Sequence, residues 1–431
     1  MDFITAQEAA ERWNISDRRV RALCRSGKIP GAVKRSKSYE IPADVEKPAD
    51  GRVRSAKPQG AAHYLKWHDA VIATISPDNS VTFSQPKYND VVAAYTRGRK
   101  AWTPEEFLDF LSERVVSRER RDIERILFRC GMSRYDVMQI AAVTRGIHPK
   151  DLLWIAFNKA EKLSEVMTDV FASVFKLKID LTGDSIDTPE GYNIKRYGVR
   201  DGQYGIYKKR ISPLAADVES EIAVCLLSQK LKVPCCPAYR ADKDTVFSAF
   251  LFDFSTEYII HFRRLFEGAR SDNEYQNLLA VRPQYKDDIE RMILLDFITR
   301  QDDRHLSNMA IKVTSSGESF YPLYDNGRSL FYEDTEEMVK NAVSDVAAHS
   351  TSFGYSGTYY DYVQEIVRDG AQVGELINLD ITEAQIRDIL IEAGFTGYRY
   401  TGALAWITKS LAILREKGGL HGTRNKFEYT S

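Results

Sequence analysis

The sequence predicts an α+β protein of two lobes, a β-rich small lobe and a larger helical lobe, preceded by a winged helix-turn-helix and a small α/β region. Three observations lead to this prediction. Two short helical patterns and an alternating segment fill the first 50 residues, strand-like segments surround one helix between residues 176 and 258, and helical periodicity dominates from residue 259 onward. A chain of 431 residues is long enough for two to four domains.

The composition is that of an ordinary globular protein. Hydrophobic residues make up 43% and charged residues 28%, and 60 Lys and Arg against 61 Asp and Glu give a formal net charge of −1. These values exclude a disordered or polycationic chain. Residues 1–60 hold eight Arg and five Lys against eight acidic residues, so this part is basic while the remainder is acidic. A basic amino-terminal module indicates an anionic partner for that module alone.

The cysteines and the amino-terminal residues indicate the cellular compartment in which we expect the protein. The five cysteines are odd in number, scattered, and without histidines at metal-ligand spacing, namely Cys24, Cys130, Cys225, Cys235 and Cys236. This pattern indicates free thiols of a reducing compartment. The first residues show no signal peptide, and no apolar run approaches the roughly 18 residues of a membrane span. We therefore expect a soluble cytoplasmic protein with no membrane partner.

Residues 1–50 predict the winged helix-turn-helix. Thr5 followed by Glu8 three residues later is the spacing of a capping box, and it opens a first helix that ends near Asn14. A second helix is expected from Asp17 to about Arg25, and residues 32–42 alternate like a small hairpin or wing.

The remaining chain divides by pattern into four parts. Residues 51–62 are rich in proline and small or charged residues and predict a linker, and residues 63–175 predict a mixed region, β first and then helical, with a supporting role. Residues 176–258 predict the small lobe and residues 259–431 the helical lobe, which a hairpin at 309–324 interrupts. A β-rich lobe followed by a helical lobe is the order of a protein-kinase-like fold.

The most informative segment is Asp302-Asp303-Arg304-His305-Leu306-Ser307-Asn308, followed by Tyr324-Asp325-Asn326-Gly327. An amphipathic helical pattern precedes it, so Asp303 falls in the loop after that helix, Asn308 precedes a strand, and Asp325 ends the returning strand. Helix, catalytic loop, hairpin and metal-binding Asp is the order in which kinases place these groups.

Phosphoryl transfer explains these residue types. The reaction needs a carboxylate that accepts the proton of the attacking hydroxyl, and oxygen ligands that hold Mg²⁺ against the nucleotide phosphates. Asp303 suits the first task, and the Asn308 amide oxygen and the Asp325 carboxylate suit the second. Arg304 or His305 would brace the loop or offset charge on the phosphates.

The residues of this loop and of the segment after the hairpin resemble the motifs of known kinase families. Asp-Arg-His-x-x-Asn with an Asp-x-Gly-like element after a hairpin resembles phosphoinositide kinases and, better along the chain, bacterial HipA-type Ser/Thr kinases. The further matches are Asp187–Gly191 with Lys195–Tyr197, Ile206–Lys209, and Glu219–Glu221, and the resemblance covers about residues 175–415. It implies an ATP- and Mg²⁺-dependent kinase that phosphorylates Ser or Thr of a protein, in a stress or toxin–antitoxin setting.

Kinases also present a lysine to the nucleotide phosphates and a helix glutamate that orients this lysine. By this analogy Lys208, after a β-like segment, and Glu221, in the next helix, are the candidates. Lys209 and Glu219 remain alternatives, because adjacent strand residues point to opposite faces and the sequence does not show which face is the cleft.

The amino-terminal module has its own resemblance. Ile4–Ala10, Ile15–Arg21 and Gly27–Pro30 are similar to MerR and excisionase-type DNA-binding domains. Basic residues on the second helix would enter a major groove, and those on the wing would contact phosphates. These candidates are Arg18, Arg19, Arg21 and Arg25 on the helix, and Lys34, Arg35 and Lys37 on the wing. The expected partner is duplex DNA, bound through residues 1–50 by a homodimer over two half-sites.

Two other hypotheses about the function remain open. The chain could be a transcription regulator whose kinase-like region only senses nucleotide, or a lipid kinase, which the Asp-Arg-His triplet would also fit. The sequence shows no amphipathic basic patch that would favour a membrane substrate.

Overall fold

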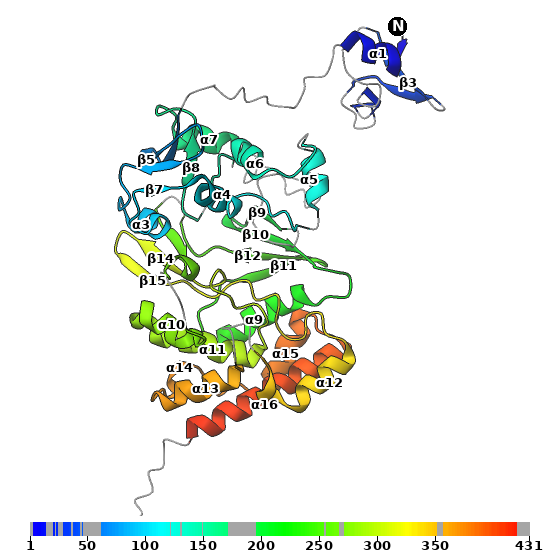
Figure 1. Cartoon of the computed structure of the whole chain (residues 1–431). Helices are drawn as coiled ribbons and strands as arrows, with labels where there is room; N and C mark the ends of the chain where they lie inside the picture. Colours follow the sequence, from blue (N-terminus) through cyan, green and yellow to red (C-terminus); the bar gives the residue numbers. More distant parts are fainter. Residues whose placement is uncertain are drawn as a thin grey trace, which may run out of the picture. The chain divides into compact units, whose positions relative to one another are not determined.

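The computed structural model describes fourteen stretches of the chain in two units. They are residues 3–13, 20–21, 23–24, 29–35, 38–43, 45, 62–120, 122–129, 132–148, 150–170, 195–253, 256–266, 271–350 and 357–419. One unit is Met1–Lys57 and the other is Pro58–Ser431 (Figure 1). Cys130, the motif Asp187–Gly191 and most of the linker lie outside the described residues.

The amino-terminal unit is built on a small antiparallel sheet. Its elements are β1 (Phe3–Thr5), α1 (Ala6–Trp13), β2 (Val33–Arg35) and β3 (Ser38–Pro42), with sheet order β1-β3-β2. The Thr5 hydroxyl accepts a hydrogen bond from the Glu8 amide, and the Thr5 amide donates to the Glu8 carboxylate, so the capping box begins α1. The strands β2 and β3 form the expected wing, and β1 is a third strand that the sequence patterns did not indicate.

The core of this unit joins α1 to later residues. The apolar stripe of α1, residues Ala6, Ala9, Ala10 and Trp13, packs with Val20, Cys24, Ile29 and Ile41. Residues 20–21 and 23–24 of the expected second helix are helical, and the rest of that segment lies outside the described residues.

The α/β region, residues 62–170, contains a five-stranded antiparallel sheet in the order β7-β6-β5-β4-β8. Its strands are β4 (His63–Trp67), β5 (Ala70–Ile75), β6 (Val81–Phe83), β7 (Ala101–Trp102) and β8 (Leu153–Ala156). Its helices are α3 (Asp90–Thr96), α4 (Pro104–Ser112), α5 (Ile123–Arg129), α6 (Val137–Thr144) and α7 (Leu163–Val170).

The stretch after Thr103 contains a strand that the sequence patterns did not indicate. This stretch is rich in helices, as expected, but β8 lies between α6 and α7 and returns to the sheet beside β4. All four residues of β8 are buried. A short, fully apolar run shows neither strand nor helix periodicity, so only the pairing with β4 decides its conformation.

A four-stranded antiparallel sheet follows in residues 195–253. Its strands are β9 (Lys195–Arg200), β10 (Gln203–Lys209), β11 (Ala238–Asp242) and β12 (Thr245–Ala249), in the order β11-β12-β10-β9, and α9 (Asp217–Leu231) packs on β11 and β12. The register places Lys208 of β10 opposite Lys195 of β9. These two lysines therefore lie side by side on the same face of the sheet.

Helices dominate residues 256–419, as expected. They are α10 (Glu274–Val281), α11 (Lys286–Thr299), α12 (Glu336–Ser344), α13 (Tyr359–Arg368), α14 (Val373–Leu376), α15 (Glu383–Ala393) and α16 (Gly397–Gly419), with short 3₁₀ turns at Phe262–Arg264, Pro283–Tyr285 and Val346–Ala348. The strands β13 (Tyr258–His261), β14 (Ala310–Thr314) and β15 (Gly317–Phe320) form a sheet in that order, and β14 and β15 are the expected hairpin. The expectation that Asp325 ends the returning strand is wrong, because the pairing with β14 stops at Phe320 and Asp325 lies in the segment that follows. Among the residues that the structure describes, no helix combines the length and the apolar composition that a membrane span requires.

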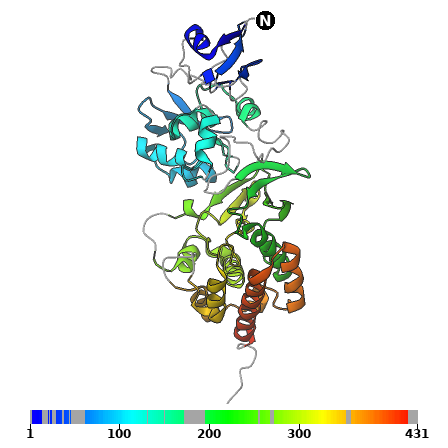
Figure 2. The ribbon, with the colours of Figure 1, turned by 90° about the vertical axis from the view of Figure 1, so that its right-hand side faces the viewer.

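Helix α11 leads into the loop that carries Asp303. Residues 289–299 of α11 are all buried except Arg291, and α16 and α13 pack against the helix (Figure 2). Arg300 ends α11 in the left-handed conformation, with φ of 48°. The chain therefore leaves a rigid, buried helix and enters the loop that carries Asp303.

The α/β region contacts both the four-stranded sheet and the strand β13. Arg120 donates to the carbonyl of Lys195 at 3.0 Å, at the start of β9. The amide of Ile259 in β13 donates to the carbonyl of Lys150 at 3.0 Å, and Arg263 pairs with Glu113 at 3.3 Å. Residues of the α/β region consequently form part of the wall of the cleft described next.

Candidate active site

A polar cleft of about 640 Å³ lies where the four-stranded sheet, the loop after α11 and the α/β region meet. The cleft brings together most of the candidate residues found in the sequence. They are Lys208, Glu221, Asp303, His305, Asn308 and Asp325. Arg304 does not line the cleft, and its position is treated below.

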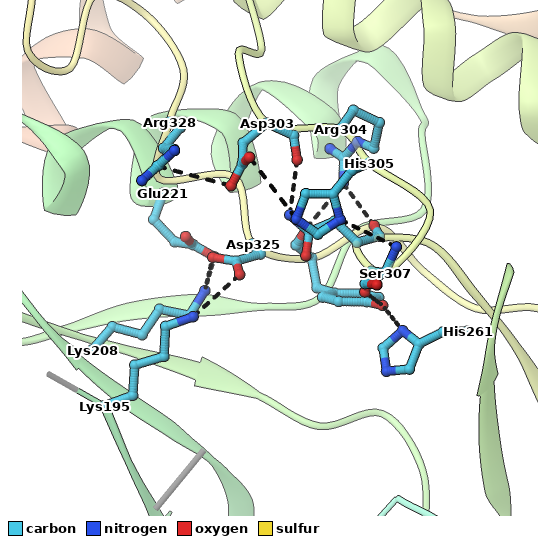
Figure 3. Close-up of polar contacts among 12 residues, drawn as sticks. Lys195, Lys208, Glu221, His261, Asp303, Arg304, His305, Ser307, Asp325 and Arg328 are labelled. Carbon is cyan, nitrogen blue, oxygen red and sulfur yellow. Dashed lines mark hydrogen bonds and ion pairs between the residues drawn. The ribbon is translucent and has the colours of Figure 1, made fainter. Parts of the chain in front are cut away.

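Lys208 occupies the centre of this arrangement. Its Nζ lies 3.0 Å from Glu221 Oε1 and 3.1 Å from Asp325 Oδ1 (Figure 3). The side chains of Lys208 and Glu221 are only 11% and 3% exposed, respectively. Burial alone would lower the pKa of Lys208, but the Asp325 and Glu221 carboxylates outweigh it and raise this pKa above its usual value. Lys208 is therefore a fixed cation at the inner end of the cleft.

The alternatives to this pair point elsewhere. Lys209 is exposed, because the next residue of a strand faces the opposite side of the sheet. Glu219 pairs with Arg210, whose Nη2 lies 2.8 Å from Glu219 Oε1. The choice that the sequence left open is thus decided by the strand register and by the face that α9 turns to β10.

Lys195 is a cleft residue that sequence reasoning missed. Its Nζ lies 3.4 Å from Asp325 Oδ2, and its side chain is 13% exposed. Burial would raise the pKa of Asp325, but Lys195 and Lys208 together hold this pKa well below its usual value. Lys195 belongs to a matched motif in the sequence, but its approach to Asp325 depends on pairing of β9 with β10.

Asp303 lies across the cleft from these lysines, in the loop that follows α11. Its amide donates to the Gln301 side chain at 2.9 Å, and its carboxylate lies 3.8 Å from Arg328 Nε and 3.9 Å from His305 Nε2. Burial raises the pKa of Asp303, while the charges of Arg328 and His305 oppose the rise. A carboxylate with a raised pKa and an open face is suited to accept a proton.

Arg304 holds the loop after α11 in place through buried contacts. Its guanidinium makes a bidentate ion pair with Asp296 of α11, at 2.9 and 3.0 Å, and donates to the carbonyls of Asn308 and Tyr324, each at 3.0 Å. Its side chain is fully buried. The sequence predicted that Arg304 would either brace the loop or offset charge on the phosphates. The buried position fits the first role, because the guanidinium is too far from solvent to contact phosphates. Asp296, which the sequence analysis did not single out, completes this brace.

Asn308 and Asp325 offer the oxygen atoms that a magnesium ion prefers. The Asn308 side-chain amide donates through Nδ2 to the Asp303 carbonyl at 2.8 Å, which leaves Oδ1 as the available ligand atom. Glu221 Oε2 is buried in the same cleft without a hydrogen-bond partner. In the part of the chain that the structure describes, no three His, Cys, Asp or Glu side chains form a complete metal site. The amide and carboxylate oxygens of Asn308 and Asp325 fit Mg²⁺ by their chemistry, since this ion commonly takes one or two protein oxygens and completes its shell with phosphates and water.

Part of the cleft lining is apolar. These side chains come from β10, β12, the segment after β12, β13 and the segment after β15, and they are Ile206, Val246, Ala249, Phe250, Phe252, Ile259 and Tyr321. An apolar wall beside two lysines and the Asp325 carboxylate fits a ligand with a flat ring at one end and phosphates at the other.

The DNA-binding candidates are described only in part. Arg21 is helical and exposed, and Lys34 is exposed on β2, next to Arg35 in the same strand. Arg18, Arg19, Arg25 and Lys37 lie outside the described residues. DNA binding through this unit therefore stays a prediction.

Comparisons with known proteins find similar structures but no family. No model of a known family matches the sequence, and no curated protein matches it. The proinflammatory kinase CtkA of Helicobacter pylori has a TM-score of 0.44 and 13% identity, over 53% of this chain and 95% of its own. HipA of the Shewanella oneidensis MR-1 toxin–antitoxin system, solved with HipB and operator DNA, has a TM-score of 0.44 and 11% identity, over 82% of this chain and 97% of its own. Similarity at this level assigns neither a fold family nor an activity to this chain.

Proposed function

We propose that this protein is an ATP- and Mg²⁺-dependent phosphotransferase, a Ser/Thr protein kinase of HipA-like type. One observation carries the proposal: Lys208 joins Glu221 and Asp325 in a cleft that Asp303 and Asn308 also line. A buried lysine held by a helix glutamate, opposite a metal-binding aspartate and a catalytic-loop aspartate, is the set of groups that phosphoryl transfer uses in kinases.

The lysines would bind the nucleotide phosphates. Glu221 holds Lys208 in place, and Lys195 adds a second positive charge beside it. Asn308 and Asp325 would hold Mg²⁺, which supplies positive charge against the phosphates of bound ATP. The two lysines also neutralise Asp325, since their ammonium groups lie 3.4 and 3.1 Å from its carboxylate oxygens.

Asp303 would accept the proton of the substrate hydroxyl. Its raised pKa, caused mainly by burial, brings it closer to the working pH than an exposed aspartate. Arg328 approaches the Asp303 carboxylate from the segment after Asp325, and its side chain is 40% exposed. We assign to Arg328 the offsetting of charge on the transferred phosphoryl group, the task that the sequence had given to Arg304 or His305.

The amino-terminal unit would bind DNA. Support comes from its three-stranded sheet with a wing, from the exposed Arg21 and Lys34, and from the basic charge of residues 1–60. Together with the resemblance to HipA-type kinases, a fused DNA-binding unit suggests a toxin–antitoxin or stress-related kinase that represses its own promoter, binding as a homodimer to two half-sites.

Labelled ATP separates this proposal from its rivals. The full chain is incubated with γ-labelled ATP and Mg²⁺, with a cell lysate, with phosphoinositide vesicles, or alone, and the Asp303→Ala protein serves as the control. Label on protein that depends on Asp303 supports a protein kinase, and phosphoamino-acid analysis must then show phosphoserine or phosphothreonine. Label only on lipid would select a lipid kinase. Nucleotide binding without any transfer would select a nucleotide sensor.

A further inference from the structure

A chain of hydrogen bonds runs from the α/β region to the catalytic loop. Lys150 Nζ lies 3.1 Å from His261 Nε2, and His261 Nδ1 lies 2.8 Å from the Tyr324 hydroxyl. That hydroxyl lies 2.9 Å from the Ser307 carbonyl oxygen. Figure 3 shows His261 reaching the catalytic loop beside Ser307. Four segments that are far apart in the sequence thus meet in one polar chain.

The direction of this chain follows from the chemistry of its members. A lysine ammonium can only donate, so His261 Nε2 accepts and the proton of the neutral ring is on Nδ1. Nδ1 then donates to the Tyr324 oxygen, and the one hydroxyl proton of Tyr324 goes to the Ser307 carbonyl, which can only accept. Burial, together with the charge of Lys150, lowers the pKa of His261 well below its usual value, in agreement with a neutral ring.

The first member of the chain is held by the backbone and by a buried ion pair. The Lys150 carbonyl accepts from the Ile259 amide at 3.0 Å, along the edge of β13. The next residue, Asp151, makes a bidentate ion pair with Arg114 at 2.6 and 2.8 Å, and both side chains are almost completely buried. The Lys150 side chain therefore extends from a backbone that other contacts already hold, so only the rotamers of the side chain itself have to be ordered.

The last two members precede the proposed magnesium ligands. Ser307 is followed by Asn308, and Tyr324 is followed by Asp325, so the Tyr324 hydroxyl on the Ser307 carbonyl ties together the two segments that carry these ligands. We propose that Lys150 is a positioning residue for phosphoryl transfer, which acts through His261 and Tyr324 to fix Asn308 relative to Asp325. This inference rests on the proposed function, and it gives the α/β region a part in the reaction.

Kinetics of a lysine variant test the proposal. Lys150→Met keeps the length of the side chain and removes the donor, so kcat should fall roughly 10- to 100-fold, as for other residues that orient a metal ligand. The Mg²⁺ concentration for half-maximal rate should rise, and Lys150→Arg, which keeps a donor, should restore most of the activity. Lys162→Met is the matched control, because Lys162 is an exposed lysine of the same region and should leave kcat unchanged.

A double-mutant cycle and a spectroscopic measurement exclude a merely structural effect. In a Tyr324→Phe background, where the chain is already broken at its end, Lys150→Met should cause no further loss of kcat. Fully additive losses would overturn the proposal, and so would a Lys150→Met protein with the wild-type rate and Mg²⁺ requirement.

The tautomer of His261 can be determined without an activity assay. In ¹⁵N NMR spectra the His261 ring of the wild-type protein should carry its proton on Nδ1, and Lys150→Met should change the Nε2 shift. A wild-type ring protonated on Nε2 would overturn the chain itself. A protein that transfers no phosphate while the tautomer is as expected would instead refute the proposed function.

Discussion

Replacing Lys208 by methionine should show how much this lysine contributes to the stability of the protein and how much to nucleotide binding. Methionine has nearly the length of lysine but no charge, so Glu221 and Asp325 lose the ammonium that lies 3.0 and 3.1 Å from them. Glu221 is 3% exposed and one of its oxygens already lacks a partner. Removing one member of such a buried pair costs about 3 to 5 kcal/mol of the free energy of unfolding.

The same substitution should weaken nucleotide binding. A hydrogen bond between charged groups contributes about 1.5 to 3 kcal/mol, which corresponds to about a 10- to 150-fold loss of Mg²⁺·ATP affinity. Calorimetric titration of the full chain with Mg²⁺·ATP measures this loss, and denaturant unfolding measures the stability. The exposed neighbour Lys209 provides the control, since Lys209→Met should change stability by less than about 0.5 kcal/mol and leave the affinity unchanged.

A companion variant distinguishes the two effects. Lys208→Met combined with Glu221→Gln removes the Glu221 carboxylate together with the lysine that neutralises it. Most of the lost stability should therefore return, while the Mg²⁺·ATP affinity stays low. Unchanged affinity in Lys208→Met, or an equal loss in Lys209→Met, would refute the placement of Lys208 at the phosphates.

Further predictions concern the base, the metal ligand, the loop arginine and the wing. Asp303→Ala should abolish phosphoryl transfer while nucleotide binding largely survives, and a variant with half of the wild-type rate would show that another group takes the proton. Asp325→Ala should weaken Mg²⁺·ATP binding as well as turnover, and calorimetry with unchanged affinity would remove Asp325 from the metal site. Arg328→Gln should raise the pKa of Asp303 further, because the charge of Arg328 lowers this pKa. Since Asp303 acts as a base only when it is deprotonated, the acidic limb of the pH profile of kcat/KM should move to higher pH. An acidic limb that does not move would contradict this contact. Lys34→Ala should weaken the binding of all duplex sequences alike and reduce the slope of log K against log salt by about 0.9, whereas a loss confined to one sequence would argue for base readout.

The order of chemical groups along the chain was predictable from the sequence. Asp303, Asn308 and Asp325 were found because local patterns place them: each follows or precedes a helix or strand whose periodicity can be read within a short window. The capping box at Thr5, the wing and the hairpin β14–β15 were predictable for the same reason, since each depends on residues close in sequence. The local sequence therefore determined the type of each element and the candidate reaction.

Only the tertiary structure decided which side chains share the cleft. Lys208 rather than Lys209 faces Asp325, and Lys195 joins it, because β9, β10 and β12 pair in one particular register. The strand β8 became recognisable only beside β4, since a four-residue apolar run has no period of its own.

The remaining differences have the same physical origin. Arg304 supports the loop instead of contacting phosphates because Asp296, which lies near the end of α11 and eight positions earlier, supplies a buried counter-charge. Lys150 meets His261 across 111 positions of sequence because the Ile259 amide at the edge of β13 donates to the Lys150 carbonyl and anchors this segment. Hydrogen bonds and ion pairs between distant segments depend on packing that brings those segments together, and no local periodicity records that packing.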